Sequence, residues 1–142
     1  MRITSLQLTA FRSFEAMKPI YFGPINVFIG ANNAGKSSIL RALYLMQAGS
    51  ESGLPDVRVG YESARILIGL EGVPPHECIS GNKNELLGAV QIDLKSQNRK
   101  SGETNMQFLR AGGGGASCAQ FPAMEPHHFV VPFLAKRKTA TY

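Results

Sequence analysis

One run of this chain has residue types at a spacing that binds phosphate. Two glycines enclose four residues and are followed by lysine and serine, which is the phosphate-loop (Walker A) pattern G-x-x-x-x-G-K-S. Glycine lets the backbone adopt conformations that a side chain blocks, so successive N–H groups can turn inward as a cradle for phosphate oxygens. The residues of the run are Gly30, Ala31, Asn32, Asn33, Ala34, Gly35, Lys36 and Ser37.

The side chains of this loop predict a nucleoside triphosphate with Mg²⁺ as the ligand. Lys36 is expected to reach the β- and γ-phosphates, and the Ser37 hydroxyl is expected to ligate the Mg²⁺ that bridges them. Ser38 and the backbone amide of Asn33 are candidate supporting donors. The structural alternative is a glycine-rich turn that contains Lys-Ser without a ligand, and the flanking elements favour the binding loop.

A strand and a helix must hold this loop for it to work. The apolar residues 25–29 predict a buried strand that leads into the loop. Residues 38–46 predict a helix with Ile39, Leu43 and Met46 on one face, which suits packing against a sheet. Such a helix directs the partial positive charge of its N-terminus at a bound phosphate.

The remaining pattern predicts strands. Residues 2–11 alternate as in a half-buried strand, and residues 17–22 form a second extended segment. Residues 65–70, 86–94 and 104–110 then predict an antiparallel meander, within which a polar stretch at 95–103 is the hairpin loop. The glycine-rich residues 111–117 are expected to form a flexible loop. We therefore divide the 142 residues into a phosphate-loop core (1–48), a meander (64–110) and a final strand (129–134).

Composition narrows the class of protein. With 142 residues and 44% hydrophobic content, the chain has the size and composition of a single globular domain, and no apolar run is long enough for a membrane span. We expect a cytoplasmic location. The net charge of +5 favours an anionic partner, which a nucleotide partly satisfies, with DNA as a further candidate. Cys78 and Cys118 lack the spacing of a metal site or a disulfide framework.

Motifs for hydrolysis and for guanine recognition are weak or absent. Glu71 and Asp93 follow apolar runs, but both are better explained as residues of meander strands than as Mg²⁺-binding carboxylates, so the catalytic residues remain unknown. Residues 82–85 read Asn-Lys-Asn-Glu, which departs from the guanine-reading motif at its last position. ATP is therefore the expected nucleotide.

Two stretches of the chain resemble a known group of ATPases. Phe11-Arg12-Ser13-Phe14 and the segment 22–40, with its Asn-Asn-Ala-Gly-Lys-Ser-Ser loop, resemble the N-terminal start of RecF/SMC/Rad50-type ABC ATPases. The loop and the residues 128–132, His-Phe-Val-Val-Pro, are most similar to OLD-like bacterial AAA-family ATPases, many of which act in phage defence.

The resemblance implies a fold and an assembly. It implies that Arg12 and Ser13 lie close to the nucleotide phosphates, with a plain surface turn as the alternative. It further implies an α/β P-loop NTPase fold, an ABC-ATPase-like N-terminal lobe with a mixed sheet and the meander. In such proteins a C-terminal half supplies the acidic, signature and switch motifs, and none of His76, His127 and His128 fits a switch residue. We therefore expect an incomplete head.

The expected function follows from the resemblance to that family, and two alternative functions stand beside it. The first hypothesis is the ATP-binding half of an ATPase coupled to DNA processing or anti-phage defence, in which two heads associate as a homo-oligomer around ATP and an effector protein is a further candidate partner. On this hypothesis the 142-residue chain alone is inactive. The alternatives are a scaffold that binds ATP without hydrolysing it, and a DNA-binding module, which steeply salt-dependent duplex binding would support.

Overall fold

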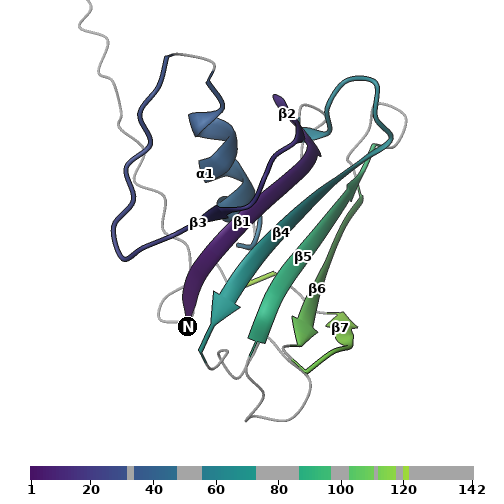
Figure 1. Ribbon diagram of the computed structural model, residues 1–142. Coiled ribbons are helices and arrows are strands. Elements are labelled where there is room, and N and C mark those ends of the chain that lie inside the picture. The colour runs from purple at the N-terminus through teal and green to yellow at the C-terminus, as the bar shows by residue number, and fades with distance from the viewer. Residues whose placement is uncertain are drawn as a thin grey trace, which may run out of the picture.

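A sheet of seven strands and one helix make up the described part of the molecule (Figure 1). The computed structural model describes residues 1–31, 34–47, 56–72, 87–96, 103–110, 112–117 and 120–121. The elements in chain order are β1 (Arg2–Phe11), β2 (Phe14–Ala16), β3 (Ile20–Tyr21), α1 (Lys36–Tyr44), β4 (Ser63–Glu71), β5 (Leu87–Lys95), β6 (Glu103–Arg110) and β7 (Gly115–Ser117).

The sheet is a meander joined to the first strand of the chain. Its order is β2-β1-β4-β5-β6-β7, and β3 also pairs with β1. Lys95 lies opposite Glu103, so β5 and β6 form the expected hairpin. The described strands all pair antiparallel, whereas the sequence predicted a mixed sheet. The prediction of an antiparallel meander is confirmed, and the mixed sheet is not observed among these residues.

Apolar side chains of four strands meet on one face of the sheet. The strand registers align them in rows across β1, β4, β5 and β6, because side chains at alternate positions share a face. Each row fills the core with large apolar side chains that are almost fully buried. One row consists of Leu8, Ile66, Ile92 and Met106, and the next consists of Leu6, Ile68, Val90 and Phe108.

Helix α1 packs on this core through one side. Ile39 and Ala42, with Leu45 and Met46 just beyond the helix, belong to the same buried cluster as the sheet residues. Leu40, between the buried Ile39 and Ala42 in the chain, is 60% exposed. The end of α1 is fixed by the segment after β7, because the Phe121 N–H donates to the Met46 carbonyl at 2.7 Å.

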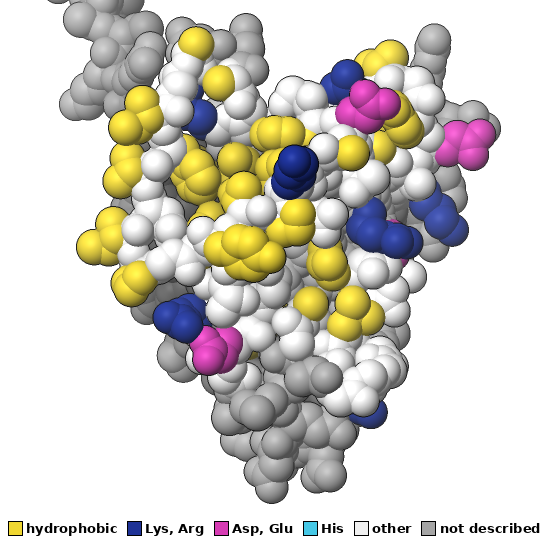
Figure 2. All heavy atoms as spheres, in the orientation of Figure 1, with side chains coloured by type: hydrophobic (Ala, Val, Ile, Leu, Met, Phe, Trp, Pro, Cys, Tyr) yellow, Lys and Arg dark blue, Asp and Glu magenta, His cyan; other side chains and the backbone are white. Residues whose placement is uncertain are grey.

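The predicted buried strand at residues 25–29 is wrong for the described molecule. These residues form no strand there, and the side chains of Ile25, Val27 and Ile29 are 88%, 76% and 92% exposed. Phe28, between them, packs edge-to-face on Phe22 with ring centroids 6.2 Å apart. Figure 2 shows the exposed apolar side chains as a yellow column along the left edge, over the segment that joins β3 to α1 in Figure 1. No described strand pairs with this segment.

Other predictions differ in outcome. Strand β1 has the predicted bounds, and β4, β5 and β6 overlap the three predicted meander strands. The glycine-rich 111–117 was expected to be a loop, but Gly115–Ser117 pairs with β6 as β7. The following predictions lie outside the described residues: the final strand 129–134, the motif at 82–85, the two cysteines and the three histidines.

Candidate functional site

The predicted phosphate loop lies at the start of α1. The helix begins at Lys36, and Gly35 precedes it with φ 90°, a left-handed conformation that favours glycine. No side-chain cap bonds to this end, and its first turn contains no acidic residue. The first N–H groups of a helix have no partner within the helix, so this end presents donors and partial positive charge to an anion.

The side chain of Lys36 bridges the loop that precedes it. Its Nζ donates to the carbonyl oxygens of Gly30 at 2.5 Å and of Ala31 at 2.6 Å. A Cβ added to Gly30 would approach Ala34 Cβ to 3.2 Å and Lys36 Nζ to 4.0 Å. The cationic group is thereby held over the loop, within reach of an anion in the cradle.

The turn between β1 and β2 touches this loop. A Cβ built on Gly35 would lie 2.5 Å from Cζ of Phe14 and 3.3 Å from Oγ of Ser13. Only glycine fits beneath the Phe14 ring at this position. Arg12 and Ser13, which the resemblance placed near the phosphates, thus belong to a turn in contact with the loop.

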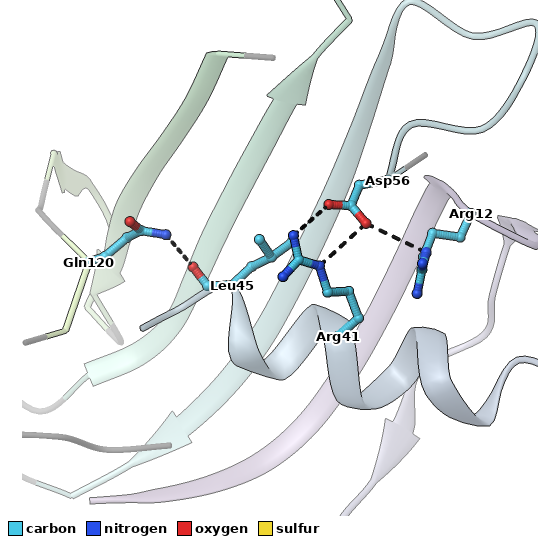
Figure 3. A network of polar contacts seen from close by, with 5 residues as sticks. All are labelled: Arg12, Arg41, Leu45, Asp56 and Gln120. Atoms are coloured by element: carbon cyan, nitrogen blue, oxygen red, sulfur yellow. Dashed lines mark hydrogen bonds and ion pairs between the residues drawn. The ribbon is translucent and has the colours of Figure 1, made fainter. Parts of the chain in front are cut away.

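A carboxylate that the sequence did not single out joins this turn to α1 (Figure 3). Asp56 is 2% exposed, and its Oδ2 lies 3.0 Å from Nη2 of Arg41. Nε of Arg12 lies 3.5 Å from Oδ1 of the same carboxylate. Arg58 adds a third cation, since its Nη1 donates to the Ser13 carbonyl at 2.8 Å. The site is therefore rich in positive charge, as a phosphate site requires.

The structure describes some, but not all, of the other residues predicted to bind the nucleotide. Ala34 donates its N–H to the Ala31 carbonyl at 3.2 Å. Ser37, the predicted Mg²⁺ ligand, is exposed at the helix start, and Ser38 is 7% exposed. Asn32 and Asn33 lie outside the described residues. The contacts of all these residues with a ligand remain predictions.

The two carboxylates weighed for Mg²⁺ binding have partners in the sheet. Glu71 ends β4 and pairs with Arg2 on the adjacent β1. Asp93 lies within β5, where its Oδ1 is 2.7 Å from Nε of Arg65. Both are residues of meander strands, as the sequence analysis favoured. The described residues contain no group of three or more His, Cys, Asp and Glu side chains that could hold a metal ion.

A cavity of about 470 Å³ lies away from the loop. It opens between the start of β1, residues 22–28 and Leu43 of α1. No residue of the phosphate loop lines it, and Leu43 lies in the last turn of the helix that Lys36 begins. The cavity is therefore separate from the predicted phosphate site. Within the described chain no helix has the length and apolar character needed to cross a membrane.

The family assignment rests on a match across most of the chain. The model of the AAA ATPase domain family matches residues 1–108, which include β1, the phosphate loop, α1 and the meander. The chain belongs to the AAA ATPase domain family. Membership makes it a P-loop NTPase, and it agrees with the loop and helix at residues 30–38.

Relatives of this AAA ATPase domain include proteins named DNA replication and repair protein RecF. The protein from Leifsonia xyli is 33% identical over 100 residues, which are 70% of this chain and 24% of the relative. Those from Acinetobacter baylyi and Clostridioides difficile are 41% and 33% identical over 49 residues, 34% of this chain and 14% and 13% of theirs. The chain thus spans about a quarter of the L. xyli protein's length. The expected RecF resemblance is confirmed, and the OLD-like likeness remains a prediction.

Proposed function

We propose that this chain is the ATP-binding part of an ATPase that acts on DNA. The observation that carries the proposal is the uncapped N-terminus of α1, with Gly35 in a left-handed conformation and Lys36 Nζ held over the loop. In P-loop proteins this arrangement binds the phosphate chain of a nucleotide. Similarity to one RecF protein over 70% of the chain supports the link to DNA.

The residues of this chain fit Mg-ATP. Lys36 would bind the outer phosphates and Ser37 would ligate Mg²⁺, while the amides at the start of α1 would hold phosphate oxygens. The bound Mg²⁺ would neutralise charge that develops on the phosphates during transfer. Arg12 and Ser13 would lie at the edge of this site, because their turn contacts Gly35.

The finer proposal concerns assembly and biological role. We take the exposed Ile25, Val27 and Ile29 as the place where further protein completes the head. Association of two heads around ATP, a C-terminal half that supplies the acidic motif and a role in phage defence with an effector rest on the resemblance alone. The cytoplasmic location is proposed from the composition of the sequence. A scaffold that binds ATP without hydrolysing it is the alternative if no acidic motif joins the loop.

Isothermal titration of the full-length protein with Mg-ATP tests the proposal. Lys36→Ala removes a cation that would bond to charged oxygens, and such bonds contribute about 1.5–3 kcal/mol, so affinity should fall by roughly 10- to 150-fold. Lys95→Ala, at the exposed end of β5, is the matched control and should bind as the parent does. Equal affinities of the parent and Lys36→Ala would refute the site. A preference for GTP in competition would overturn the assignment of ATP.

A further inference from the structure

Asp56 is a buried carboxylate whose partners come from two elements of the phosphate site. Its side chain is 3% exposed. Arg41 of α1 binds it with two nitrogens, Nη2 to Oδ2 at 3.0 Å and Nε to Oδ1 at 3.5 Å. Arg12 approaches the same Oδ1 with its Nε at 3.5 Å, as Figure 3 shows. A buried charge is tolerated only with such partners, so the carboxylate fixes where the two arginines lie relative to each other.

Backbone contacts hold the same turn in a strained form. Ala10 and Arg12 have φ of 51° and 50°. For residues with a Cβ this left-handed region is unfavourable and persists only where the surroundings impose it. The Arg12 N–H donates to the Asp56 carbonyl at 3.0 Å, and the Arg58 N–H donates to the Ala10 carbonyl at 2.8 Å. The backbone of Asp56 and Arg58 therefore holds the turn and the end of β1 in this conformation.

The strained turn meets the phosphate loop. Ser13 and Phe14 lie against Gly35, the residue before α1. The Arg12 side chain is 33% exposed, and within the part of the chain that the structure describes only its Nε has a partner. The two terminal nitrogens of its guanidinium thus remain for a ligand, and their fork matches two phosphate oxygens.

We infer that Asp56 is a positioning residue for the nucleotide. It holds Arg12 by Nε and α1 by Arg41, so that the terminal nitrogens of Arg12 and the start of the helix bind one phosphate chain together. This role rests on the proposed ATP binding. No sequence pattern indicates this role, because Asp56 lies 15 residues from Arg41 in the chain.

The negative charge of Asp56 and its positioning of the two arginines should have opposite effects on ATP affinity. An experiment can therefore separate the two. Removing the Asp56 charge would leave Arg12, Arg41 and Lys36 less neutralised, and the field alone would tighten ATP binding. Asp56→Glu keeps the charge but lengthens the side chain by one methylene. Weaker binding of ATP by this variant can therefore be attributed to displaced partners.

A double-mutant cycle on full-length protein tests the inference. Mg-ATP affinity is measured by titration for the parent, Asp56→Glu, Arg12→Gln and the double variant. Coupled residues interact by about 0.5–3 kcal/mol, so the loss of affinity caused by Asp56→Glu should be at least roughly twofold larger in the parent than in Arg12→Gln, where only the contact with Arg41 is left to disturb. Asp93→Glu, in the Arg65 pair on the sheet, is the matched control and should leave affinity unchanged.

The outcomes are distinct. An equal loss in both Arg12 backgrounds, or no loss in either, overturns the positioning role while leaving ATP binding intact. If the parent itself does not bind Mg-ATP, the proposed function fails and the inference with it. If Asp56→Glu does not fold, as a thermal melt would show, the same cycle is run with Arg12→Lys and Arg41→Lys. Their effects on ATP affinity must then be non-additive, since both residues act through the one carboxylate.

Discussion

The meander and the segment before the phosphate loop have the same alternation of apolar residues but different environments. In β5, Val90, Ile92 and Leu94 are fully buried because β4 and β6 lie on either side and α1 contributes to the core that covers them. In the segment 22–31, Ile25 and Ile29 are largely exposed, and no described strand pairs with the segment. The difference shows that alternating apolar residues predict an apolar face on a segment. Whether that face is buried depends on another element that packs against it.

The strongest test of this comparison is the cost of truncating each region. Ile92→Ala removes buried methylene groups from the central row of the core, and the free energy of unfolding of the 142-residue chain should fall by about 2–5 kcal/mol. Val27→Ala, at 76% exposure, should change it by less than about 0.5 kcal/mol. Urea unfolding measures both. A loss at Val27 as large as that at Ile92 would mean that the segment is buried and that the contrast is wrong.

The contrast can be sharpened at two glycines with nearly the same φ angle. Gly35 and Gly60 have φ of 90° and 91°, but an added Cβ meets the Phe14 ring at 2.5 Å in the first case and nothing within 4 Å in the second. Gly60→Ala should therefore cost only the backbone term, about 1–2 kcal/mol. Gly35→Ala should cost more and also weaken Mg-ATP binding, which thermal melts and titration would show. Equal stability losses would disprove the contact between Phe14 and the loop.

Substitutions in the exposed row of Ile25, Val27 and Ile29 should have the smallest effect on stability and the clearest effect on self-association. Replacing Ile25, Val27 and Ile29 together by serine should leave the unfolding free energy nearly unchanged but reduce self-association of the 142-residue chain, as measured by light scattering. Val59→Ser is the matched control, since Val59 is 97% exposed but lies outside the row. If the parent chain is already a compact monomer with a cooperative melt, the proposal that further protein covers this row fails.

The sheet could be predicted where strands find partners within the described chain. Residues of β1 and β5 alternate cleanly, and their registers bury the side chains that the pattern selected. The same reasoning failed at residues 25–29, because a pattern of side chains does not say where the covering strand comes from. It also failed at Gly115–Ser117, where backbone pairing with β6 forms a strand that the glycine-rich composition did not suggest.

The candidate site was predictable where its chemistry is local. Lys36, Gly35 and the helix start follow from a spacing of a few residues. Asp56 does not, because it meets Arg12 and Arg41 only through the tertiary fold, and its immediate neighbours in sequence show no pattern. Sequence reasoning thus identified the residues of the loop and missed the carboxylate that links the helix to the adjoining turn.

The pairing of β1 with β4 also has a consequence for folding. These strands are neighbours in the sheet, yet the phosphate loop and α1 lie between them in the chain. The connections within the meander are shorter than the one between β1 and β4, so joining β1 to β4 has the higher entropic cost of loop closure. We expect the meander to form early and β1 to dock late. The ATP site, which needs both the turn after β1 and α1, would then be among the last parts of the molecule to assemble during synthesis and refolding.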